Sequence, residues 1–443
     1  MSKPIPVDTL ISARWVIPVE TDTIHHEHSV AIQSGTIMDL LPTERALQRY
    51  LPTEHIDCPR HALLPGLVNA HTHVAMNLLR GIADDLPLNE WLQQHIWPAE
   101  ARWLSEQFVR DGTRLAMAEM LRGGTTTFND MYLFPDTTAQ CVLESGMRAM
   151  VGLVVLDFPT PWAQHADEYL RRGLELRDHL KGTARVYTAL APHAPYTVSD
   201  APLRRIAVLA NELDLPVHMH VHETAHEIEE SEQRHGVRPL TRLDRLGLVG
   251  PNLLAVHMTQ LTEAEIELLA ERRVNVLHCP ESNLKLASGI CPVTRLRRRG
   301  VNVALGTDGA ASNNDLDLFA EMRTAALLAK GISGDARALN AHQVLRMATL
   351  DGARALGIDQ DVGSIVKGKA ADLIAVDLDR IETQPLYDPV SQLVYACGRE
   401  AVDHVWVAGR TLLWKRRLTT LDETELLSVA RDWQGRIAST HRV

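Results

Sequence analysis

The hydrophobic positions of this 443-residue chain change their pattern twice. The first sixty residues contain short β-rich runs at 10–18, 29–32 and 36–40, with the turn residues Gln33-Ser34-Gly35 between the last two. This pattern predicts short strands. The polar residues 25–28 precede the second run, and we expect them to form an exposed loop.

Between about residue 62 and residue 310, short apolar runs alternate with longer helical stretches. Runs that are apolar on both faces are typical of parallel strands joined by crossover helices. Eight such units are the number found in a closed (β/α)8 TIM barrel of about 250 residues, and an open doubly wound sheet rarely needs so many. The eight runs are 63–70, 125–129, 148–156, 185–192, 215–221, 253–258, 274–279 and 301–306.

The pattern after the barrel predicts helices at 318–330 and 341–356, then β-like runs at 372–376, 402–407 and 411–414, and a last amphipathic helix at 423–437. Neither β-rich end is long enough for a good core of its own, so we expect both ends to pack together as one small β-sandwich. The predicted division is 1–61 for the N-terminal part of the sandwich, 62–362 for the barrel, and 363–443 for the C-terminal part with the final helix.

Composition narrows the class of protein. A chain with 45% hydrophobic and 23% charged residues is neither disordered nor fibrous. The net charge of −11 argues against a nucleic-acid-binding surface, which must neutralise phosphates. No apolar run approaches the roughly 20 residues of a membrane span, and residues 1–9 lack an apolar signal core, so we expect a cytoplasmic protein. Five scattered cysteines contain no CxxC pair, which argues against a disulfide framework.

Several of the 21 histidines stand where predicted strands end. Barrel enzymes place their catalytic groups at this end of the strands. His71 and His73 follow the first strand at i and i+2, so they point to one side and suit one metal ion. Further candidates stand on strands five to eight: His218, His220, His222, His257, His278 and Asp308. Imidazoles with one carboxylate suit Zn²⁺, with Fe²⁺ as the second choice.

These residues lie in motifs that resemble a known family. The segment PGLVNAHTH at 65–73 resembles the strand-one motif of the amidohydrolase superfamily. The segments HCPESNLKL at 278–286 and GTDGAASNN at 306–314 resemble its 5-methylthioadenosine/S-adenosylhomocysteine deaminase branch, which includes chlorohydrolase-like relatives. The segment GKAADLI at 368–374 resembles the family's return to the sandwich. The resemblance covers nearly the whole chain.

The resemblance implies a metal site. On strand five the residues alone leave three histidines on one face, and the family pattern His-x-x-Glu selects His220 together with Glu223. Binuclear relatives often use a bridging lysine at the end of strand three or four. Here the only lysine between residues 131 and 218 is Lys181, which precedes strand four, so we expect one metal ion. The implied ligands are His71, His73, His220 and Asp308.

The resemblance also implies hydrolytic deamination of an adenine nucleoside (5′-methylthioadenosine, S-adenosylhomocysteine or adenosine) to the inosine form and ammonia. A metal-activated water is the nucleophile in such a reaction. Glu223 would carry a proton from this water to the ring nitrogen, and Asp308 would pass a second proton to the leaving ammonia. His257 would orient the water or stabilise the tetrahedral intermediate. The roles of His222 and His278 stay open.

Four residues are candidates for contacts with this small-molecule substrate. By the resemblance, Trp91 packs on the nucleoside, Glu100 accepts hydrogen bonds from the ribose, and His193 contacts the purine or the ribose. Arg148 matches an arginine that meets the carboxylate of S-adenosylhomocysteine. Some relatives supply a second arginine shortly afterwards, but residues 157–162 contain none, which favours 5′-methylthioadenosine or adenosine. The family also suggests a homo-oligomer, dimeric or larger.

Three other interpretations were weighed. The same core chemistry serves hydrolases of guanine, cytosine or s-triazines, so the core residues do not separate these substrates. The segment HETAH at 222–226 matches the HExxH zinc protease motif. That motif requires a helix, whereas His222 closes a strand-like run. A non-catalytic assembly protein would have lost the ligand set, which is present here.

Overall fold

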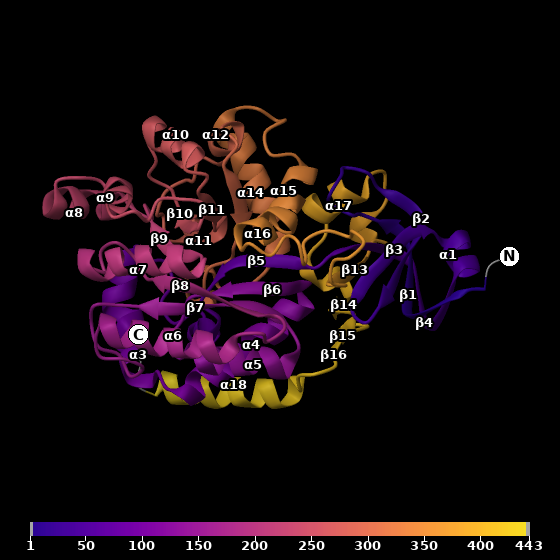
Figure 1. Ribbon diagram of the computed structural model, residues 1–443, viewed down its shortest axis with the longest axis horizontal. Helices are drawn as coiled ribbons and strands as arrows, with labels where there is room; N and C mark the ends of the chain where they lie inside the picture. The colour runs from indigo at the N-terminus through magenta and orange to yellow at the C-terminus, as the bar shows by residue number, and fades with distance from the viewer. Residues whose placement is uncertain (1–2, 440–443) are drawn as a thin grey trace. The chain divides into compact units, whose positions relative to one another are not determined.

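The computed structural model describes residues 3–439 and contains two eight-stranded sheets (Figure 1). The chain divides into two compact units. The sandwich unit comprises the segments up to Val68, 118–127 and 317–420, and the barrel unit comprises 69–117, 128–316 and the chain from Leu421 on. No helix in the described part of the chain has the length and apolar character of a membrane span.

The first sheet follows the chain in order from β5 to β12. The neighbours from β7 to β12 pair in parallel, and a bridge between Thr72 and Asp308 links the two outer ends, so that the sheet is nearly closed. The predicted (β/α)8 barrel is confirmed. Its strands are β5 (Leu67–Thr72), β6 (Thr125–Asp130), β7 (Arg148–Val155), β8 (Val186–Pro192), β9 (Val217–Val221), β10 (Leu253–His257), β11 (Asn275–His278) and β12 (Asn302–Leu305).

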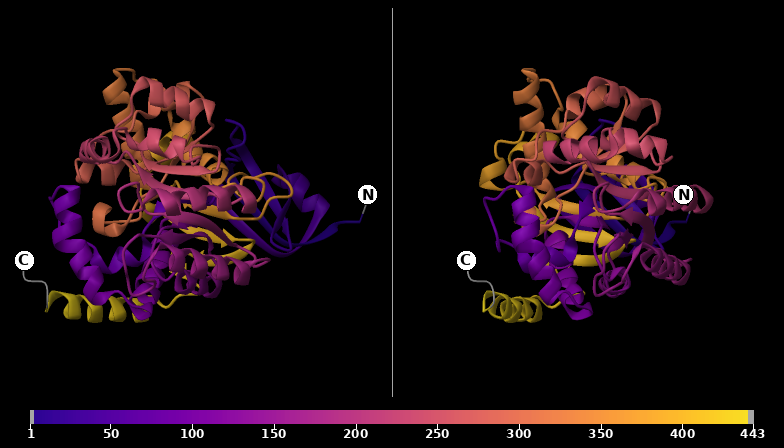
Figure 2. Two further views of the ribbon diagram at one scale, coloured as in Figure 1. Left: turned by 60° about the vertical axis from the view of Figure 1, so that its left-hand side comes forward. Right: turned by 90° about the vertical axis from the view of Figure 1, so that its left-hand side faces the viewer.

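Helices follow the strands and lie outside this sheet (Figures 1 and 2). The last helix, α18 (Glu423–Ala438), is part of the barrel unit, where the Trp433 indole N–H donates to Asp111 at 2.8 Å. The helices of the barrel region are η1 (Val74–Leu79), α2 (Leu88–Glu90), η2 (Trp91–Ile96), α3 (Trp97–Trp103), α4 (Glu106–Arg122), α5 (Pro135–Ser145), α6 (Ala166–Leu180), α7 (Asp200–Leu213), α8 (Ala225–His235), α9 (Pro239–Arg245), α10 (Glu263–Glu271), α11 (Pro280–Lys285), α12 (Val293–Arg298) and α13 (Ala310–Asn313).

The predicted run at 63–70 is two strands instead of one. Its first residues end β4 (Tyr50–Pro65) in the other sheet, and β5 begins at Leu67. The break falls at Gly66, where a Cβ atom would lie 2.1 Å from Oγ1 of Thr126. Only glycine fits so close an approach, and this lets the chain leave one sheet and enter the other.

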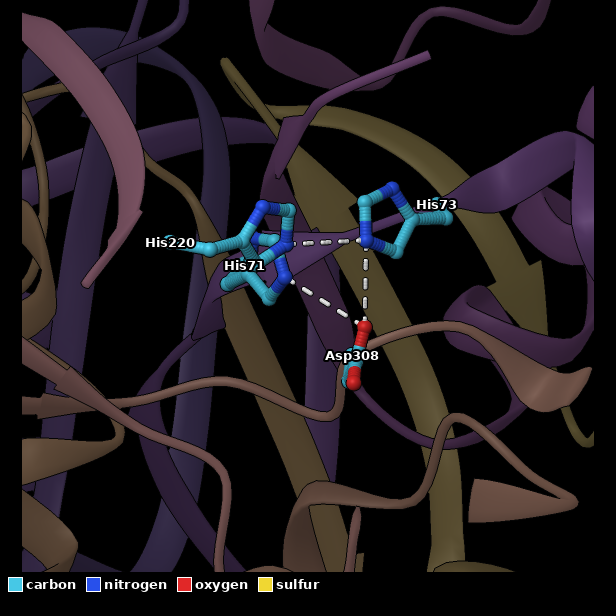
Figure 3. Close-up of side chains that lie close together, drawn as sticks. All are labelled: His71, His73, His220 and Asp308. Atoms are coloured by element: carbon cyan, nitrogen blue, oxygen red, sulfur yellow. Dashed lines mark hydrogen bonds and ion pairs between the residues drawn. The ribbon is translucent and has the colours of Figure 1, made fainter. Parts of the chain in front are cut away.

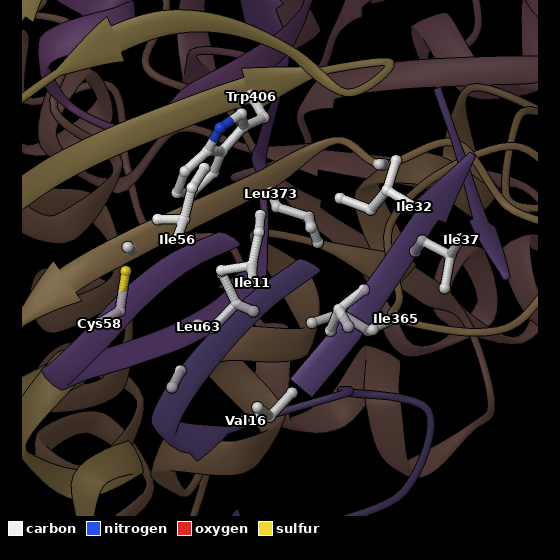
Figure 4. Close-up of a cluster of buried hydrophobic side chains, with 14 residues drawn as sticks. Ile11, Val16, Ile32, Ile37, Ile56, Cys58, Leu63, Ile365, Leu373 and Trp406 are labelled. Atoms are coloured by element: carbon white, nitrogen blue, oxygen red, sulfur yellow. The ribbon is translucent and has the colours of Figure 1, made fainter. Parts of the chain in front are cut away.

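The second sheet combines both ends of the chain in the order β16-β15-β14-β13-β4-β1-β2-β3. Buried residues from β1, β2, β4, β13 and β14 share one core, which fits the predicted small β-sandwich (Figure 4). The strands besides β4 are β1 (Ile5–Val16), β2 (His25–Gln33), β3 (Thr36–Pro42), β13 (Leu373–Asp377), β14 (Val402–Val407), β15 (Arg410–Trp414) and β16 (Arg417–Leu418).

Two other local predictions are wrong. Residues 25–28 are the exposed start of β2 and not a loop, because the partner strand β1 extends far enough to pair with them. The single helix predicted at 341–356 is broken into α15 (Ala341–Met347) and α16 (Leu350–Ala355) at Thr349, whose φ and ψ are −135° and −95°. The remaining helices are α1 (Thr43–Arg49), α14 (Leu318–Ser333), η3 (Ile381–Thr383), α17 (Pro389–Tyr395) and η4 (Arg399–Ala401).

Candidate active site

Four side chains meet at the C-terminal ends of three barrel strands (Figure 3). His71 is on β5 and His73 just beyond it, His220 is on β9, and Asp308 follows β12. The Oδ1 atom of Asp308 lies 3.3 Å from Nε2 of His71 and 3.2 Å from Nε2 of His73. The Nε2 atoms of His73 and His220 are 3.3 Å apart. One donor atom from each residue lies within 4.8 Å of every other, so the structure brings the four predicted ligands together.

The outer nitrogens of these imidazoles are held by neighbouring groups. Nδ1 of His73 lies 2.6 Å from the carbonyl oxygen of Met131, and Nδ1 of His220 lies 2.7 Å from that of His193. A carbonyl oxygen can only accept, so each Nδ1 carries the hydrogen, and in a neutral ring Nε2 presents its lone pair. Such outer hydrogen bonds orient histidine ligands of metal ions. The inner lone pairs and the Asp308 carboxylate therefore form a donor set that fits a divalent cation.

Asp308 is held in place from two sides. Its φ is 64°, a conformation that costs energy for a residue with a side chain. The backbone N–H of Gly309 donates to Oδ1 at 2.8 Å, and the hydroxyls of Ser282 and Ser312 donate to Oδ2 at 2.7 and 2.9 Å. Sequence reasoning missed both serines. Their signal was available, because each lies inside a motif that resembles the family.

The charges of the cluster depend on one another. Burial opposes the charged form of Asp308, but its hydrogen bonds to His71 and His73 hold the pKa of the carboxyl well below its usual range. Burial likewise opposes protonation of His73, whereas Asp308 raises the pKa of His73 to about 9. Burial lowers the pKa of His71 to about 4. A proton on His73 therefore competes with a cation for Nε2 of that ring, and binding of a divalent ion requires the loss of this proton.

The other two histidines of strand five have different partners. His218 is buried, and its Nε2 lies 2.8 Å from Nδ1 of His71, so it supports that ring from behind. Nε2 of His222 accepts the backbone N–H of Leu240 at 3.0 Å, which leaves this nitrogen occupied outside the cluster. His222 also precedes helix α8, so it does not share a helix face with His226 as the HExxH protease motif requires.

A cavity of about 690 Å³ adjoins the cluster. Trp91, Glu100, His193, Glu223 and His257 line it together with His73, His220 and Asp308. Much of the remaining wall is apolar, and no lysine or arginine is among the described residues that line the cavity. The apolar side chains include Leu88, Leu92, Trp97, Leu156, Phe158 and Pro161.

Arg148 is not at this cavity. It begins β7, whereas the cavity is lined by Val154, six residues further along the same strand. At 3.3 Å per residue, that spacing is roughly 20 Å. Arg148 is buried, and its guanidinium donates to the hydroxyl of Tyr187 at 3.3 Å. The structure therefore does not bring the predicted carboxylate partner to the site.

Glu223 and His257 lie side by side on the cavity wall, with Oε1 and Nε2 3.7 Å apart. Nδ1 of His257 is 2.8 Å from Oδ1 of Asn283, a contact that orients the ring. Burial raises the pKa of the Glu223 carboxyl. A raised pKa makes a carboxyl a better proton acceptor than an ordinary one, while it can still release the proton again. His278 ends β11 in a buried position outside this cavity lining.

The predicted substrate residues also have defined partners. The Tyr132 hydroxyl donates to Oε1 of Glu100 at 2.6 Å, which leaves the second carboxylate oxygen for another donor. Nδ1 of His193 is 3.1 Å from Oγ1 of Thr197, and burial lowers the pKa of His193 to about 3, so the ring is neutral. Trp91 begins the π-helical turn η2 and is buried. These three side chains can present hydrogen-bond acceptors and an aromatic face to a ligand.

The barrel, the three-histidine and one-aspartate cluster, and the buried carboxyl beside it define a metal-dependent hydrolase. The model of the amidohydrolase family matches residues 62–412, and the chain belongs to that family. The resemblance noted from the motifs is thereby confirmed. Family membership opposes the protease interpretation, and the intact ligand set opposes the assembly-protein interpretation.

The chain resembles named relatives over nearly its full length. It is 50% identical over 438 residues to a 5-methylthioadenosine/S-adenosylhomocysteine deaminase of Saccharophagus degradans, which covers 99% of this chain and 98% of the relative. It is 47% identical to a 5′-deoxyadenosine deaminase of Methanothermobacter thermautotrophicus, covering 85% of this chain and 87% of the relative. The crystal structure of an adenosine deaminase from Xanthomonas campestris, with bound zinc, has a TM-score of 0.98, 56% identity, and coverage of 99% and 100%.

Proposed function

We propose that this protein deaminates an adenine nucleoside by hydrolysis, giving the inosine form and ammonia. The observation that carries the proposal is that the four-residue cluster and the buried carboxyl of Glu223 open into one cavity of about 690 Å³, which exceeds the volume of a nucleoside. Relatives named as deaminases of adenine nucleosides, which match the chain over nearly its full length, support the same reaction.

In this proposal His71, His73, His220 and Asp308 hold one divalent ion. Zinc is the first choice because this donor set suits it and because the Xanthomonas campestris structure has bound zinc. Fe²⁺ is the alternative. When bound, such an ion would lower the pKa of a water molecule to about 7 and so supply a nucleophile at neutral pH.

The protein's own side chains move the protons. Glu223 accepts a proton from the attacking water on its carboxylate and delivers it to the ring nitrogen beside the amidine carbon. Asp308 collects the second proton and passes it to the departing ammonia, while Ser282 and Ser312 hold its other oxygen. His257, oriented by Asn283, stabilises the tetrahedral intermediate next to Glu223.

The residues that line the cavity favour some adenine nucleosides over others as substrates. Trp91 covers the nucleoside, the free oxygen of Glu100 accepts from ribose hydroxyls, and His193 meets the purine or the ribose. An apolar 5′ group fits the leucine, tryptophan and phenylalanine side chains of the wall, whereas a carboxylate would find no described cationic partner there. We therefore expect 5′-methylthioadenosine and adenosine to be better substrates than S-adenosylhomocysteine.

We also propose that the chain divides into residues 1–61, 62–362 and 363–443, that the protein is cytoplasmic, and that it is a homo-oligomer. Light scattering coupled to size-exclusion chromatography tests the last of these, and a single peak at 49.3 kDa would contradict it.

Initial rates on a substrate panel test the function. The panel contains 5′-methylthioadenosine, adenosine, S-adenosylhomocysteine, guanine, cytosine and an s-triazine, with Glu223→Gln as the matched control. We expect adenine nucleosides to react, with kcat/KM for 5′-methylthioadenosine at least about tenfold above that for S-adenosylhomocysteine. Turnover of guanine, cytosine or the triazine alone would refute the proposed substrate class and leave the fold and the family unaffected.

A further inference from the structure

A second buried glutamate lies directly behind Glu223. Glu227 is in the first turn of α8 and is 4% exposed. Its Oε1 accepts the backbone N–H of His222 at 3.0 Å, and its Oε2 accepts the backbone N–H of Glu223 at 2.7 Å. The two oxygens of one carboxylate thus accept two consecutive backbone N–H groups. One belongs to Glu223, the proposed proton carrier, and the other to His222, the residue before it.

The segment that Glu227 holds is strained. Strand β9 ends at Val221 and helix α8 begins at Ala225, so the chain must turn within three residues. His222 makes this turn with a φ of 55°, in the left-handed region that is strained for a residue with a Cβ atom. Such a conformation persists only where the surroundings hold it.

The ordinary role of a glutamate at this position is a different one. Thr224 is the N-cap of α8, and its hydroxyl accepts the N–H of Glu227. In a capping box the third-position glutamate would reach back to the N–H of the N-cap residue. Glu227 reaches past Thr224 to the two residues before it. Its side chain therefore serves the turn that carries Glu223 instead of completing the helix cap.

We propose that Glu227 is a positioning residue, which holds the turn at 222–223 so that the Glu223 carboxyl is aimed into the cavity. The inference rests on the proposed role of Glu223. Burial raises the pKa of the Glu227 carboxyl to about 8, while its two backbone N–H donors favour the carboxylate form, in which both oxygens are acceptors. Thr259 supports the same turn from the other side, because its hydroxyl donates to the Glu223 carbonyl oxygen at 2.7 Å.

The test compares Glu227→Gln with Glu230→Gln. Glutamine has the shape of glutamate but turns one acceptor into an NH₂ donor, which would face a backbone N–H. Glu230 is on the same helix, but it is paired with Arg234 and does not hold the turn, so it is the matched control. For Glu227→Gln we expect kcat on the best substrate to fall by about 10²-fold, because misplacing a catalytic group by about 1 Å has such an effect. The KM and the metal content of Glu227→Gln should change less than about twofold. The kcat of the control variant Glu230→Gln should also stay within about twofold of wild type.

A double variant separates positioning from independent effects. If Glu227 acts through Glu223, adding Glu227→Gln to Glu223→Gln should change the residual kcat by less than about threefold. Multiplied losses in the double variant, or an unchanged kcat in Glu227→Gln alone, would overturn the inference. Glu227→Asp keeps two acceptor oxygens, so its kcat should fall less than that of Glu227→Gln. This second variant keeps the test informative if Glu227→Gln folds poorly. Near-normal kcat in Glu223→Gln would instead refute the role of Glu223 itself.

Discussion

Two groups of histidine and aspartate occur in the described residues, one in each compact unit, and they are built differently. The barrel unit has the cluster of His71, His73, His220 and Asp308. The sandwich unit has a second group, formed by His61, Asp403 and His404. In this second group Nε2 of His61 binds Oδ2 of Asp403 directly at 3.2 Å, and Nδ1 of His404 accepts the N–H of Lys415 at 3.3 Å.

The difference lies in where the hydrogen bonds point. In the barrel cluster, outer bonds to the carbonyl oxygens of Met131 and His193 turn two Nε2 atoms toward the centre of the cluster. Asp308 contacts two imidazoles there, and a third imidazole converges on the same point. In the sandwich group Nε2 of His61 also contacts a carboxylate, but its outer nitrogen, Nδ1, has no hydrogen-bond partner among the described residues. Nearness of histidines is therefore not sufficient for a metal site. Convergence from several strands with the outer nitrogens already bonded distinguishes the barrel cluster.

The largest effect is expected when one histidine is removed from each of the two groups. His73→Ala and His61→Ala remove side chains that are 13% and 8% exposed, so the two variants are matched in burial. We expect His73→Ala to lose the metal ion and at least about three orders of magnitude in turnover. His61→Ala should keep one ion per chain and a rate within about twofold of wild type. Elemental analysis and initial rates measure both, and an ion lost only from His61→Ala would reverse the assignment.

The next largest effect is expected for a variant of Glu223, which distinguishes metal binding from proton transfer. Glu223→Gln keeps the shape of the side chain but removes the group that takes up the proton. We expect full metal content with a kcat lowered by about 10²–10⁴-fold. The two quantities should be measured on one preparation. A variant that loses its metal would show that Glu223 belongs to the cluster and not beside it.

A smaller effect tests the importance of the outer hydrogen bonds. His218→Leu removes the partner of His71 Nδ1 without touching the inner nitrogens. Loss of such a partner costs about 10–100-fold in metal affinity. Competition with a chelator of known affinity measures this change. If the affinity of His218→Leu equals that of wild type, the outer bond does not explain the difference between the two groups.

The smallest effect concerns the sandwich group. The hydrogen bond from His61 lowers the pKa of Asp403 from its ordinary value of 3.8. A lowered carboxyl pKa contributes stability above the ordinary value and loses it as the pH falls through the folded-state pKa. Asp403 is partly exposed, so Asp403→Asn should cost less than about 1 kcal/mol at pH 7 and leave turnover unchanged. Urea unfolding should show a larger difference between the variant and wild type at pH 7 than at pH 3.

Much of the fold was predictable because it depends on local pattern. The eight apolar runs lie close to the eight barrel strands, since strands buried on both faces need continuous apolar residues. The break at Gly66 was not predictable, because its cause is the close approach of Thr126 from another strand. Likewise, the run at 341–356 contains no proline, and its one glycine, Gly352, lies inside the second helix and does not mark the turn at Thr349.

Some features of the candidate site were likewise predictable from the sequence, and others were not. The sequence by itself determined which residue types stand at the strand ends, because position along a strand decides which end of a barrel a residue reaches. The apolar pattern left His218, His220 and His222 equivalent, and only the resemblance to the family selected His220. The tertiary structure adds the physical reason, because each ring has a different partner from elsewhere in the chain: His71, His193 and Leu240. It also placed Arg148 at the far end of its strand and Glu227 behind Glu223. Hydrogen-bond direction is a property of the folded neighbourhood, and no local pattern encodes it.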